Sequence, residues 1–376
     1  MKYIYLLFSI SISVVSAQDL YTENFDGLSV GNVDPDFNTS NDEQGGFMVN
    51  FSDFSSGNTS TMDESNFTIF AHGMAIPHDD PNQADFKNSL KIDTESLEGI
   101  VASVSKDGIE ALWNNRTTGN DVLQFEFDIF TGPQTNSNST ADFYIADQQT
   151  SNNATVDKPL IGLKFNYQSR EVDGYFWQNN AIYDVNFVEV GTNNPFTIPA
   201  DTWVRVQFRY ESSTGKVYGE VVFIREVSPN NYLRETWTYD GLNTPPADTN
   251  MTPKMFLISN NTEMNATGLA ATSIQVDNIT VSAETDVNFS NNAYTNSLNN
   301  ITSLYPNPAN EHLTIEIPDN DIKKVTIMDL NGRRISSIAT NKLSKANISI
   351  SDLSTGVYLV ETLTDKGYSI LKFMKQ

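Results

Sequence analysis

Residues 122–130 read Val122-Leu-Gln-Phe-Glu-Phe-Asp-Ile-Phe130, and they give the clearest indication of fold in this chain of 376 residues. Apolar and polar residues alternate along them, which predicts a β-strand with one face in a core and the other face outside. The apolar face holds Leu123, Phe125, Phe127 and Ile129, and the polar face holds Gln124, Glu126 and Asp128. Segments 160–167 and 204–210 alternate in the same way. Such strands, joined by turns rich in Asn, Gly, Ser and Pro, predict a two-sheet antiparallel sandwich.

Two further segments, 173–177 and 217–224, are apolar or aromatic on both faces. This pattern predicts strands in the centre of a sheet. Residues 32–65 are polar, and we expect a long loop region there. No amphipathic helix is predicted upstream of residue 282, so the predicted fold class is all-β.

A second, smaller β unit is predicted from Leu304-Tyr-Pro-Asn-Pro308 to the C-terminus. Residues 313–317 alternate as a strand, and Asn331-Gly332 is a hairpin signal because both residues tolerate the positive φ of a tight turn. Short strands with a turn between each pair predict a small Ig-like β-sandwich over 304–376. Residues 283–303 are rich in Asn, Ser and Thr, which predicts a linker.

Four motifs in this C-terminal unit appear in a characteristic order. They are Leu304–Pro308, Met328-Asp-Leu-Asn-Gly-Arg333, Leu353-Ser-Thr-Gly-Val-Tyr358 and the basic end Lys372-Phe-Met-Lys375. Together they resemble the type A sorting domain of type IX secretion. In that family the domain directs export across the outer membrane and is often removed on the way. The resemblance implies the type IX machinery as a partner and a secreted or outer-surface location, and it implies no chemistry.

The N-terminus indicates export as well. Residues 1–17 combine Met1-Lys2, an apolar run from Ile4 to Val15 and the small residues Ser16-Ala17. This pattern is typical of a secretory signal peptide. No later apolar run is as long, so we expect no transmembrane segment in the mature chain.

Composition excludes several classes of partner and site. The formal charge of -24 makes nucleic acid an improbable partner, because such a surface repels phosphate backbones, and it is compatible with cations or neutral glycans. The chain has no cysteine, which removes disulfides, thiolate metal sites and thiol nucleophiles. No sequence motif indicates an organic cofactor.

The upstream part carries a second resemblance. Residues 201–218, with Trp203 opening a strand and Ser213-Thr-Gly215 in the following turn, resemble a hairpin of concanavalin A-like lectin/glucanase jelly rolls. Residues 23–27 and 276–281 resemble the paired terminal strands of such domains. The resemblance implies a large antiparallel jelly roll over 18–282. It also implies a possible calcium site where those strands meet, with the oxygen ligands Glu23, Asp26 and Asp277.

Glu126 and Asp128 are the carboxylates that most suggest catalysis. Laminarinase-type glycosidases of the jelly-roll class carry Glu-x-Asp-x-Glu on such a strand, and the last Glu is the general acid. Here Phe130 stands at that position, so the double displacement lacks its proton donor. The alternative is that Glu126 and Asp128 pair with bases on a neighbouring strand, such as Arg205 or Arg209.

Other catalytic signatures are absent from the sequence. The chain has three histidines, no Gly-x-Ser-x-Gly elbow and no His-Glu-x-x-His motif. A lyase whose catalytic residues are distant from one another in sequence is not excluded by these absences. Calcium is the only cofactor expected, through its oxygen ligands.

Aromatic pairs favour binding over catalysis. Tyr175 and Trp177 share one side of a predicted strand, as do Trp237 and Tyr239, and such rings can stack on sugars. We therefore hypothesise a secreted or cell-surface, non-catalytic carbohydrate-binding or adhesive protein. The alternatives are a polysaccharide-degrading hydrolase or lyase, and a structural surface protein without a small ligand. The candidate ligand-binding residues are Glu126, Asp128, Lys164, Asn166, Tyr175, Trp177, Arg205 and Trp237.

Overall fold

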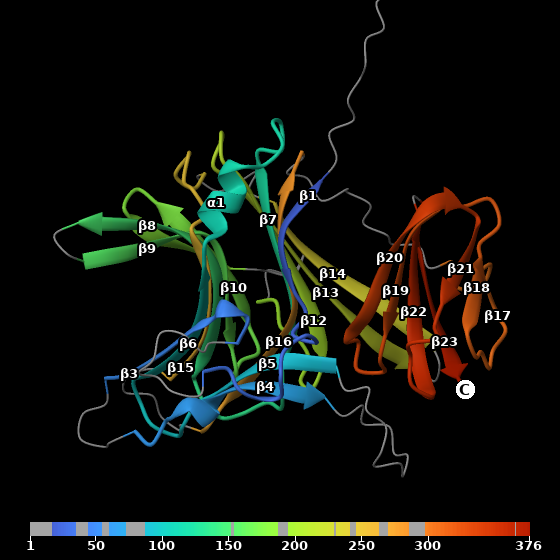
Figure 1. Ribbon diagram of the computed structural model, residues 1–376, viewed down its shortest axis with the longest axis horizontal. Coiled ribbons are helices and arrows are strands. Elements are labelled where there is room, and N and C mark those ends of the chain that lie inside the picture. Colours follow the sequence, from blue (N-terminus) through green and yellow to red (C-terminus); the bar gives the residue numbers. More distant parts are fainter. Residues whose placement is uncertain are drawn as a thin grey trace, which may run out of the picture.

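The computed structural model describes residues 17–34, 44–54, 60–72, 87–151, 154–186, 195–228, 231–240, 246–262, 270–285, 298–364 and 366–376. The predicted signal peptide lies outside these residues except for Ala17. The chain forms two β bodies that lie side by side (Figure 1). Their sheets are antiparallel throughout, so the predicted all-β class, a large jelly roll followed by a small Ig-like sandwich, is confirmed.

One sheet of the jelly roll has nine strands in the described residues. Its order is β14 (Asn231–Asp240), β13 (Lys216–Ser228), β12 (Trp203–Glu211), β7 (Val122–Phe130), β16 (Ser273–Glu284), β5 (Lys87–Asp93), β4 (Phe67–His72) and β2 (Gly31–Asn32). β1 (Gln18–Glu23) also pairs with β16. The opening stretch of the sequence is therefore β7, between β12 and β16.

The second sheet of the jelly roll has seven described strands. Its order is β11 (Ala181–Asn186), β10 (Val172–Gln178), β9 (Ala154–Asn166), β8 (Thr140–Ser151), β15 (Met255–Asn261), β6 (Ile100–Asp107) and β3 (Met48–Asp53). Of these, β8 and β9 project furthest from the body (Figure 1).

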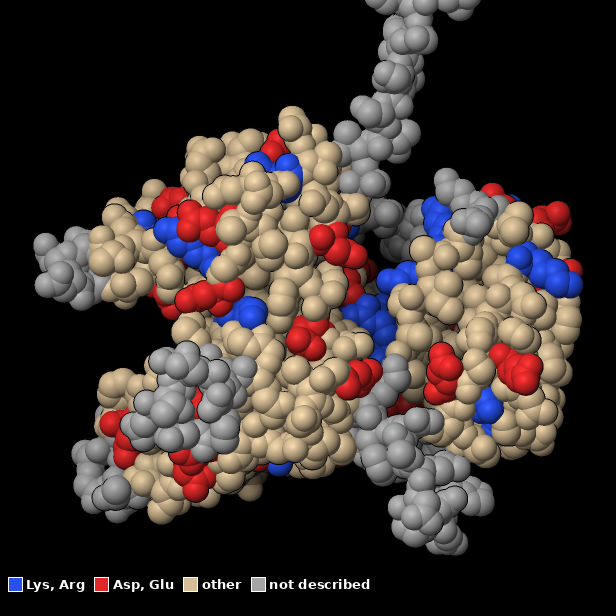
Figure 2. Space-filling model, viewed as in Figure 1, with Lys and Arg blue, Asp and Glu red and all other residues tan. Residues whose placement is uncertain are grey.

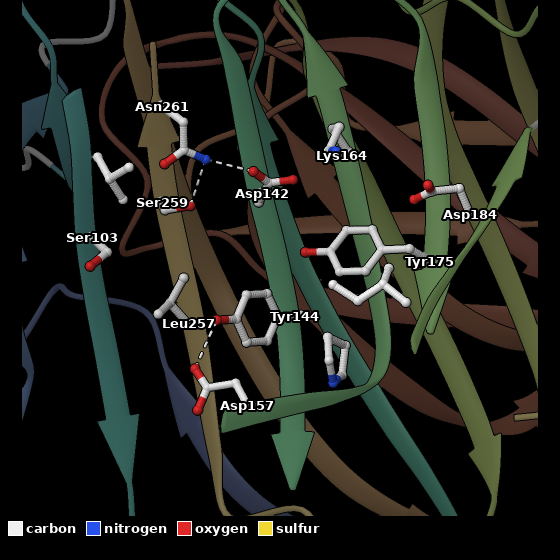
Figure 3. Close-up of a pocket in the computed structure, with 13 residues that line it drawn as sticks. Ser103, Asp142, Tyr144, Asp157, Lys164, Tyr175, Asp184, Leu257, Ser259 and Asn261 are labelled. Carbon is white, nitrogen blue, oxygen red and sulfur yellow. Dashed lines mark hydrogen bonds between the residues drawn. The ribbon is translucent and has the colours of Figure 1, made fainter. Parts of the chain in front are cut away.

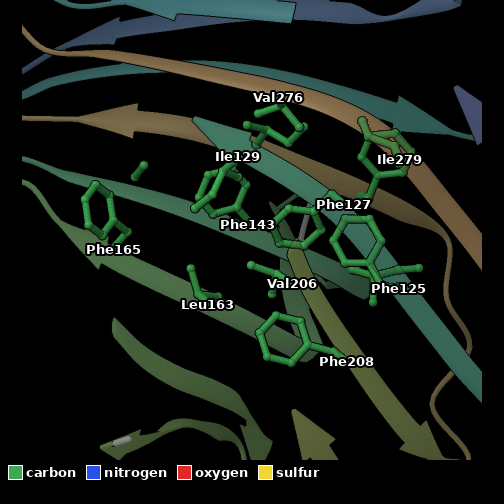
Figure 4. Packing of buried hydrophobic residues seen from close by; sticks show 14 of the residues in the cluster. Phe125, Phe127, Ile129, Phe143, Leu163, Phe165, Val206, Phe208, Val276 and Ile279 are labelled. Atoms are coloured by element: carbon green, nitrogen blue, oxygen red, sulfur yellow. The ribbon is translucent and has the colours of Figure 1, made fainter. Parts of the chain in front are cut away.

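Aromatic side chains fill the space between the two sheets. Phe127 of the nine-stranded sheet stacks on Phe143 of the seven-stranded sheet, with ring centroids 4.9 Å apart. Phe125 and Phe208 lie beside them, and all are almost fully buried (Figure 4). Burial of this apolar surface is the main stabilising contribution to the sandwich, which has no disulfide.

The C-terminal sandwich has its own core. β17 (Ser303–Tyr305), β18 (His312–Glu316) and β21 (Lys345–Ser349) form one sheet. β20 (Arg334–Leu343), β19 (Ile322–Met328), β22 (Gly356–Thr364) and β23 (Tyr368–Lys375) form the other. The predicted Asn331-Gly332 hairpin turn is confirmed between β19 and β20, where Gly332 has a φ of 82°.

The structure differs from the sequence-based expectation in three places. A short helix, α1 (Ile109–Asn114), buries Trp113, and six residues are too few for a helical period to be visible in the sequence. β3 and two 3-10 turns, Gln44–Gly46 and Glu64–Asn66, lie in the segment predicted to be a loop. β10 and β13 lie next to sheet edges, not at the centre. Among the described residues, no helix is long and apolar enough to cross a membrane.

Candidate functional site

The outer face of the seven-stranded sheet contains a hollow of about 380 Å³ (Figures 2 and 3). Strand alternation directs its residues outward. On β8, for example, Ala141, Phe143 and Ile145 enter the core, while Asp142 and Tyr144 lie on the opposite face. The lining residues are Val101, Ser103, Asp142, Tyr144, Asp157, Pro159, Lys164, Tyr175, Ile182, Asp184, Leu257, Ser259 and Asn261.

Strand register arranges most of these side chains in two rows across the sheet, which also include Asp173 and Gly162 beside the hollow. The first row runs Asp173, Lys164, Asp142, Ser259 and Ser103. The second row runs Asp184, Tyr175, Gly162, Tyr144 and Leu257. A polar row therefore lies beside an aromatic row, which is the combination found in small-molecule sites.

Gly162 allows the two tyrosines to meet. A Cβ at this position would lie 2.6 Å from the Tyr175 ring and 2.9 Å from Tyr144 Cβ. In its absence the rings approach edge to face, with centroids 6.2 Å apart. Tyr144 Oη donates to Asp157 Oδ2 at 3.0 Å, which fixes the direction of that ring (Figure 3).

The hollow is electrostatically negative. Its described lining includes three carboxylates, Asp142, Asp157 and Asp184, against the single base Lys164. Burial raises the pKa of Tyr144 and of Tyr175, and the nearby carboxylates add to the rise. A tyrosine that acts as a base in a lyase needs the opposite shift, because only the tyrosinate accepts a proton.

Asp142 has an unusual protonation equilibrium. Burial raises its pKa from 3.8 to about 6, and the nearby charge of Asp184 adds to the rise. Lys164 and a hydrogen bond from Asn261 Nδ2, 2.5 Å from Asp142 Oδ2, act in the opposite direction. A carboxyl group that titrates near neutrality in a polar hollow can act as an acid or as a hydrogen-bond donor.

The titration of Asp142 is expected to affect stability. Because its folded pKa is the higher one, the stability from this group is present below about pH 4 and is lost as the pH rises through about 6. Asp142→Asn keeps an oxygen for Asn261 and removes the titration. As the pH rises from about 4 to about 7.5, we expect the free energy of unfolding of the variant to increase by about 2–3 kcal/mol relative to that of the unmodified chain. Urea unfolding at both pH values measures this gain, and an equal difference at both would contradict it.

The residues predicted to bind a ligand do not form one site. Lys164 and Tyr175 line the hollow. Asn166 Oδ1 instead accepts from the backbone N–H groups of Gln168 and Ser169 in the β9–β10 turn. Trp177 packs against the edge of the core, with Lys158 Nζ 5.5 Å from its ring centroid. Trp237 belongs to β14, but its side chain lies outside what the structure describes.

Glu126, Asp128 and Arg205 lie on the opposite face, the outer face of the nine-stranded sheet. Arg205 Nε is 3.6 Å from Asp128 Oδ1, as the alternative pairing hypothesis required. The other base expected there, Arg209, bonds to Gln124 instead. Arg334 of the C-terminal sandwich also reaches both carboxylates, and no sequence pattern indicated this contact.

Phe130 lies on the same face as Glu126 and packs against Trp203, with ring centroids 5.5 Å apart. A second opening of about 520 Å³ lies nearby, between this sheet and the C-terminal sandwich. Its lining is mainly polar and includes Lys324 and Arg334 of the C-terminal sandwich. The hollow of the seven-stranded sheet combines polar and aromatic side chains, and for this reason we take it as the candidate site.

The three carboxylates predicted for calcium are engaged elsewhere. Glu23 Oε1 accepts from the N–H of Phe25, Asp26 Oδ1 from the N–H of Asn88, and Asp277 Oδ2 from Arg333. The described residues contain no group of three or more His, Asp or Glu side chains arranged to hold a metal. Calcium at these positions stays a prediction.

Comparison with known families identifies the C-terminal sandwich. The family called secretion system C-terminal sorting domain matches residues 303–376. These residues are a type IX sorting domain. The resemblance carried by its four motifs is confirmed, so the chain is exported and is either surface-located or secreted. The sorting domain also implies contact with the type IX machinery.

No curated relative matches the sequence. Solved structures with a similar arrangement include the PL-14 alginate lyase of Aplysia kurodai, at 10% identity and a TM-score of 0.38, covering 70% of this chain and 99% of the lyase. A legume lectin-like domain of Entamoeba histolytica has 11% identity and a TM-score of 0.30, covering 52% and 84%. The binding domain of botulinum neurotoxin serotype D/C has 12% identity and a TM-score of 0.36, covering 93% and 73%. At such scores nothing about ligand or activity transfers to this chain.

Two sets of site residues were not predicted from the sequence. Asp142 and Tyr144 alternate with the core residues of β8, so a period-two pattern was available for them. Arg333 and Arg334 directly follow the hairpin turn, but their partners are more than 50 residues away in sequence. Only the turn itself was detectable.

Proposed function

We propose that this exported protein binds a neutral glycan in the hollow of the seven-stranded sheet. The observation that supports it is the pair of tyrosines, Tyr144 and Tyr175, beside a row of hydrogen-bonding side chains. Aromatic rings stack on the apolar faces of sugars, and carboxylate, amide and hydroxyl groups bind their hydroxyls.

The charge of the hollow favours a neutral ligand. Three carboxylates against one lysine repel uronates and sulfated sugars, and the formal charge of -24 adds to this repulsion. A neutral sugar has no such cost, and its hydroxyl groups can donate to the carboxylates.

A panel of neutral and anionic polysaccharides tests the proposal with the purified full chain. We expect retention on neutral polysaccharides and none on uronate or sulfated ones. Tyr144→Ala should weaken binding about tenfold or more, because burying the face of a large side chain against a ligand contributes roughly 1.5–3 kcal/mol. Tyr305→Ala is the matched control, since that tyrosine is exposed and lies in the sorting domain. Retention of no neutral polysaccharide would instead favour a structural surface protein.

A hydrolase is the second candidate, because burial raises the pKa of Asp142 to about 6 within a group of carboxylates. A carboxylic acid that is partly protonated near neutrality is what glycoside hydrolysis requires of its general acid. Release of reducing sugar from a bound polysaccharide, lost in Asp142→Asn, would establish this activity. Binding without release would leave the non-catalytic function.

A further inference from the structure

The tip of the β19–β20 hairpin touches the outer face of the nine-stranded sheet. Figure 1 shows the sorting domain beside β12, β13 and β16, and Figure 2 shows basic side chains gathered at the junction. Asn331 accepts a backbone hydrogen bond of 3.0 Å from the N–H of Trp203. Gly332 follows at positive φ, and a Cβ there would lie 3.5 Å from the Trp203 carbonyl oxygen. The turn therefore fits closely against the start of β12.

Arg333 binds at the β16 side of this contact. Its Nη2 lies 2.7 Å and its Nε 3.1 Å from Asp277 Oδ2. The same Nη2 also donates to the carbonyl oxygen of Asn88, at 2.9 Å. The guanidinium lies 5.4 Å from the Trp203 ring centroid. Arg333 is thus held by a carboxylate, a carbonyl group and an aromatic ring of the jelly roll.

Arg334 binds the two carboxylates of β7. Its Nε donates to Asp128 Oδ2 at 3.1 Å, and its Nη1 donates to Glu126. Asn278 supports the pair, because its side-chain amide donates to Asp128 Oδ2 at 2.9 Å. Although burial acts in the opposite direction, the charges of Arg334, Lys324 and Arg205 lower the pKa of Glu126 to about 2. Glu126 therefore stays ionised at neutral pH.

These groups are removed from water by the contact. Burial raises the pKa of Asp277 from 3.8 to about 7, although the nearby charge of Arg333 lowers it. Each of the five residues Glu126, Asp128, Asp277, Arg333 and Arg334 is at most 9% exposed. A buried charge without its partner is strongly unfavourable, so this arrangement is specific for two guanidinium groups at this spacing. A tethered domain that touched the sheet at random would leave the carboxylates hydrated.

Apolar surface surrounds the ion pairs. On the sorting domain, Met328, Leu359 and Ile370 are buried although they belong to a cluster outside its main core. Across from them, Val222 on the outer face of β13 is 5% exposed and lines a small space shared with Trp203 and Met328. β14 also lies against β23. The contact explains why Val222, an outward apolar residue of a strand near a sheet edge, is buried.

We propose that the outer face of the nine-stranded sheet is a docking surface for the chain's own sorting domain, held there by Arg333 and Arg334. Docking covers the outer face of the four-stranded sheet of the sorting domain. The three-stranded sheet stays exposed, with His312, Lys345 and Asn347 in water. The hollow lies on the opposite face of the jelly roll and stays open while the sorting domain is docked.

Cutting the linker in the folded full chain tests this proposal. A protease recognition sequence is inserted within residues 286–297, the chain is purified intact and cut, and gel filtration follows the two pieces. We expect them to elute together. The double variant Arg333→Glu/Arg334→Glu should elute as two separate pieces. The matched control Lys345→Glu/Lys366→Glu carries the same charge change on exposed lysines away from the docked face of the sorting domain and should stay together.

A milder variant covers the case in which reversing the charges of both arginines prevents folding. Arg334→Gln keeps a donor and most of the side-chain volume, and we expect the cut pieces to dissociate about 30-fold more readily than in the unmodified protein. Separation of the unmodified pieces, or equal association of Arg334→Gln and unmodified pieces, would overturn the proposal. Glycan retention by the hollow serves as an independent readout, which docking variants should leave unchanged.

Discussion

Replacing Asp128 by alanine is expected to lower the free energy of unfolding of the full chain by about 3–5 kcal/mol. Asp128 is 3% exposed and is the acceptor at which three partners meet. Arg334 lies 3.1 Å from it, Asn278 2.9 Å and Arg205 3.6 Å. Alanine would leave two guanidinium groups buried near Glu126 alone, and an uncompensated buried charge costs more than the lost attraction.

Denaturant unfolding of the full chain measures this loss. Asp128→Asn keeps one acceptor oxygen and the side-chain volume, so its loss should be smaller than that of Asp128→Ala. Asp121→Ala is the matched control, because Asp121 also pairs with an arginine, Arg116, at 2.7 Å but its side chain is 56% exposed. An exposed pair contributes at most about 1 kcal/mol. Equal losses for Asp128→Ala and Asp121→Ala would contradict the buried network.

Phe127 precedes Asp128 and points into the core. Replacing it by alanine is expected to lower the free energy of unfolding by a similar amount. Phe127 is fully buried and contacts Phe125 at 4.9 Å, Phe143 at 4.9 Å and Phe208 at 6.4 Å between ring centroids. Phe127→Ala would leave a cavity between the two sheets of the jelly roll, and such a cavity costs about 3–5 kcal/mol.

Phe54→Ala is the control for this prediction, because that ring is 62% exposed and should cost under about 1 kcal/mol. The shape of the transition is a second readout. Since Phe127 joins the two sheets, both sheets should unfold together at lower denaturant concentration. A loss under about 1 kcal/mol for Phe127→Ala would mean that the sheets are not held by this aromatic contact.

Much of the fold was predictable because its signals are local. The alternation at 122–130 predicted β7 and assigned its two faces correctly, and Asn331-Gly332 predicted the β19–β20 turn. The four motifs of the sorting domain lie within 72 residues and were matched as a family over 303–376. Each of these features depends on side-chain direction or on turn geometry over a few residues.

The candidate site was predictable only in part. Lys164 and Tyr175 were identified from their own strands, but Asp142 and Tyr144 were not. Glu126 and Asp128 were assigned to the same site as Lys164, whereas the structure places them on the other sheet. An alternating strand shows which residues leave the core, but it does not show which of the two sheets contains the strand.

The sequence by itself determined the fold class, the sorting domain and the two faces of each strong strand, because these follow from short-range spacing. The tertiary structure decided which outward faces meet. Register brings Tyr144, Gly162 and Tyr175 into one row, although they are distant in the chain. Domain docking brings Arg334 to Asp128 across 206 residues. Strand register and domain docking both depend on pairing between residues far apart in the sequence. Glu126 and Asp128 of residues 122–130 consequently bind an arginine of the sorting domain, and the hollow forms on the opposite sheet.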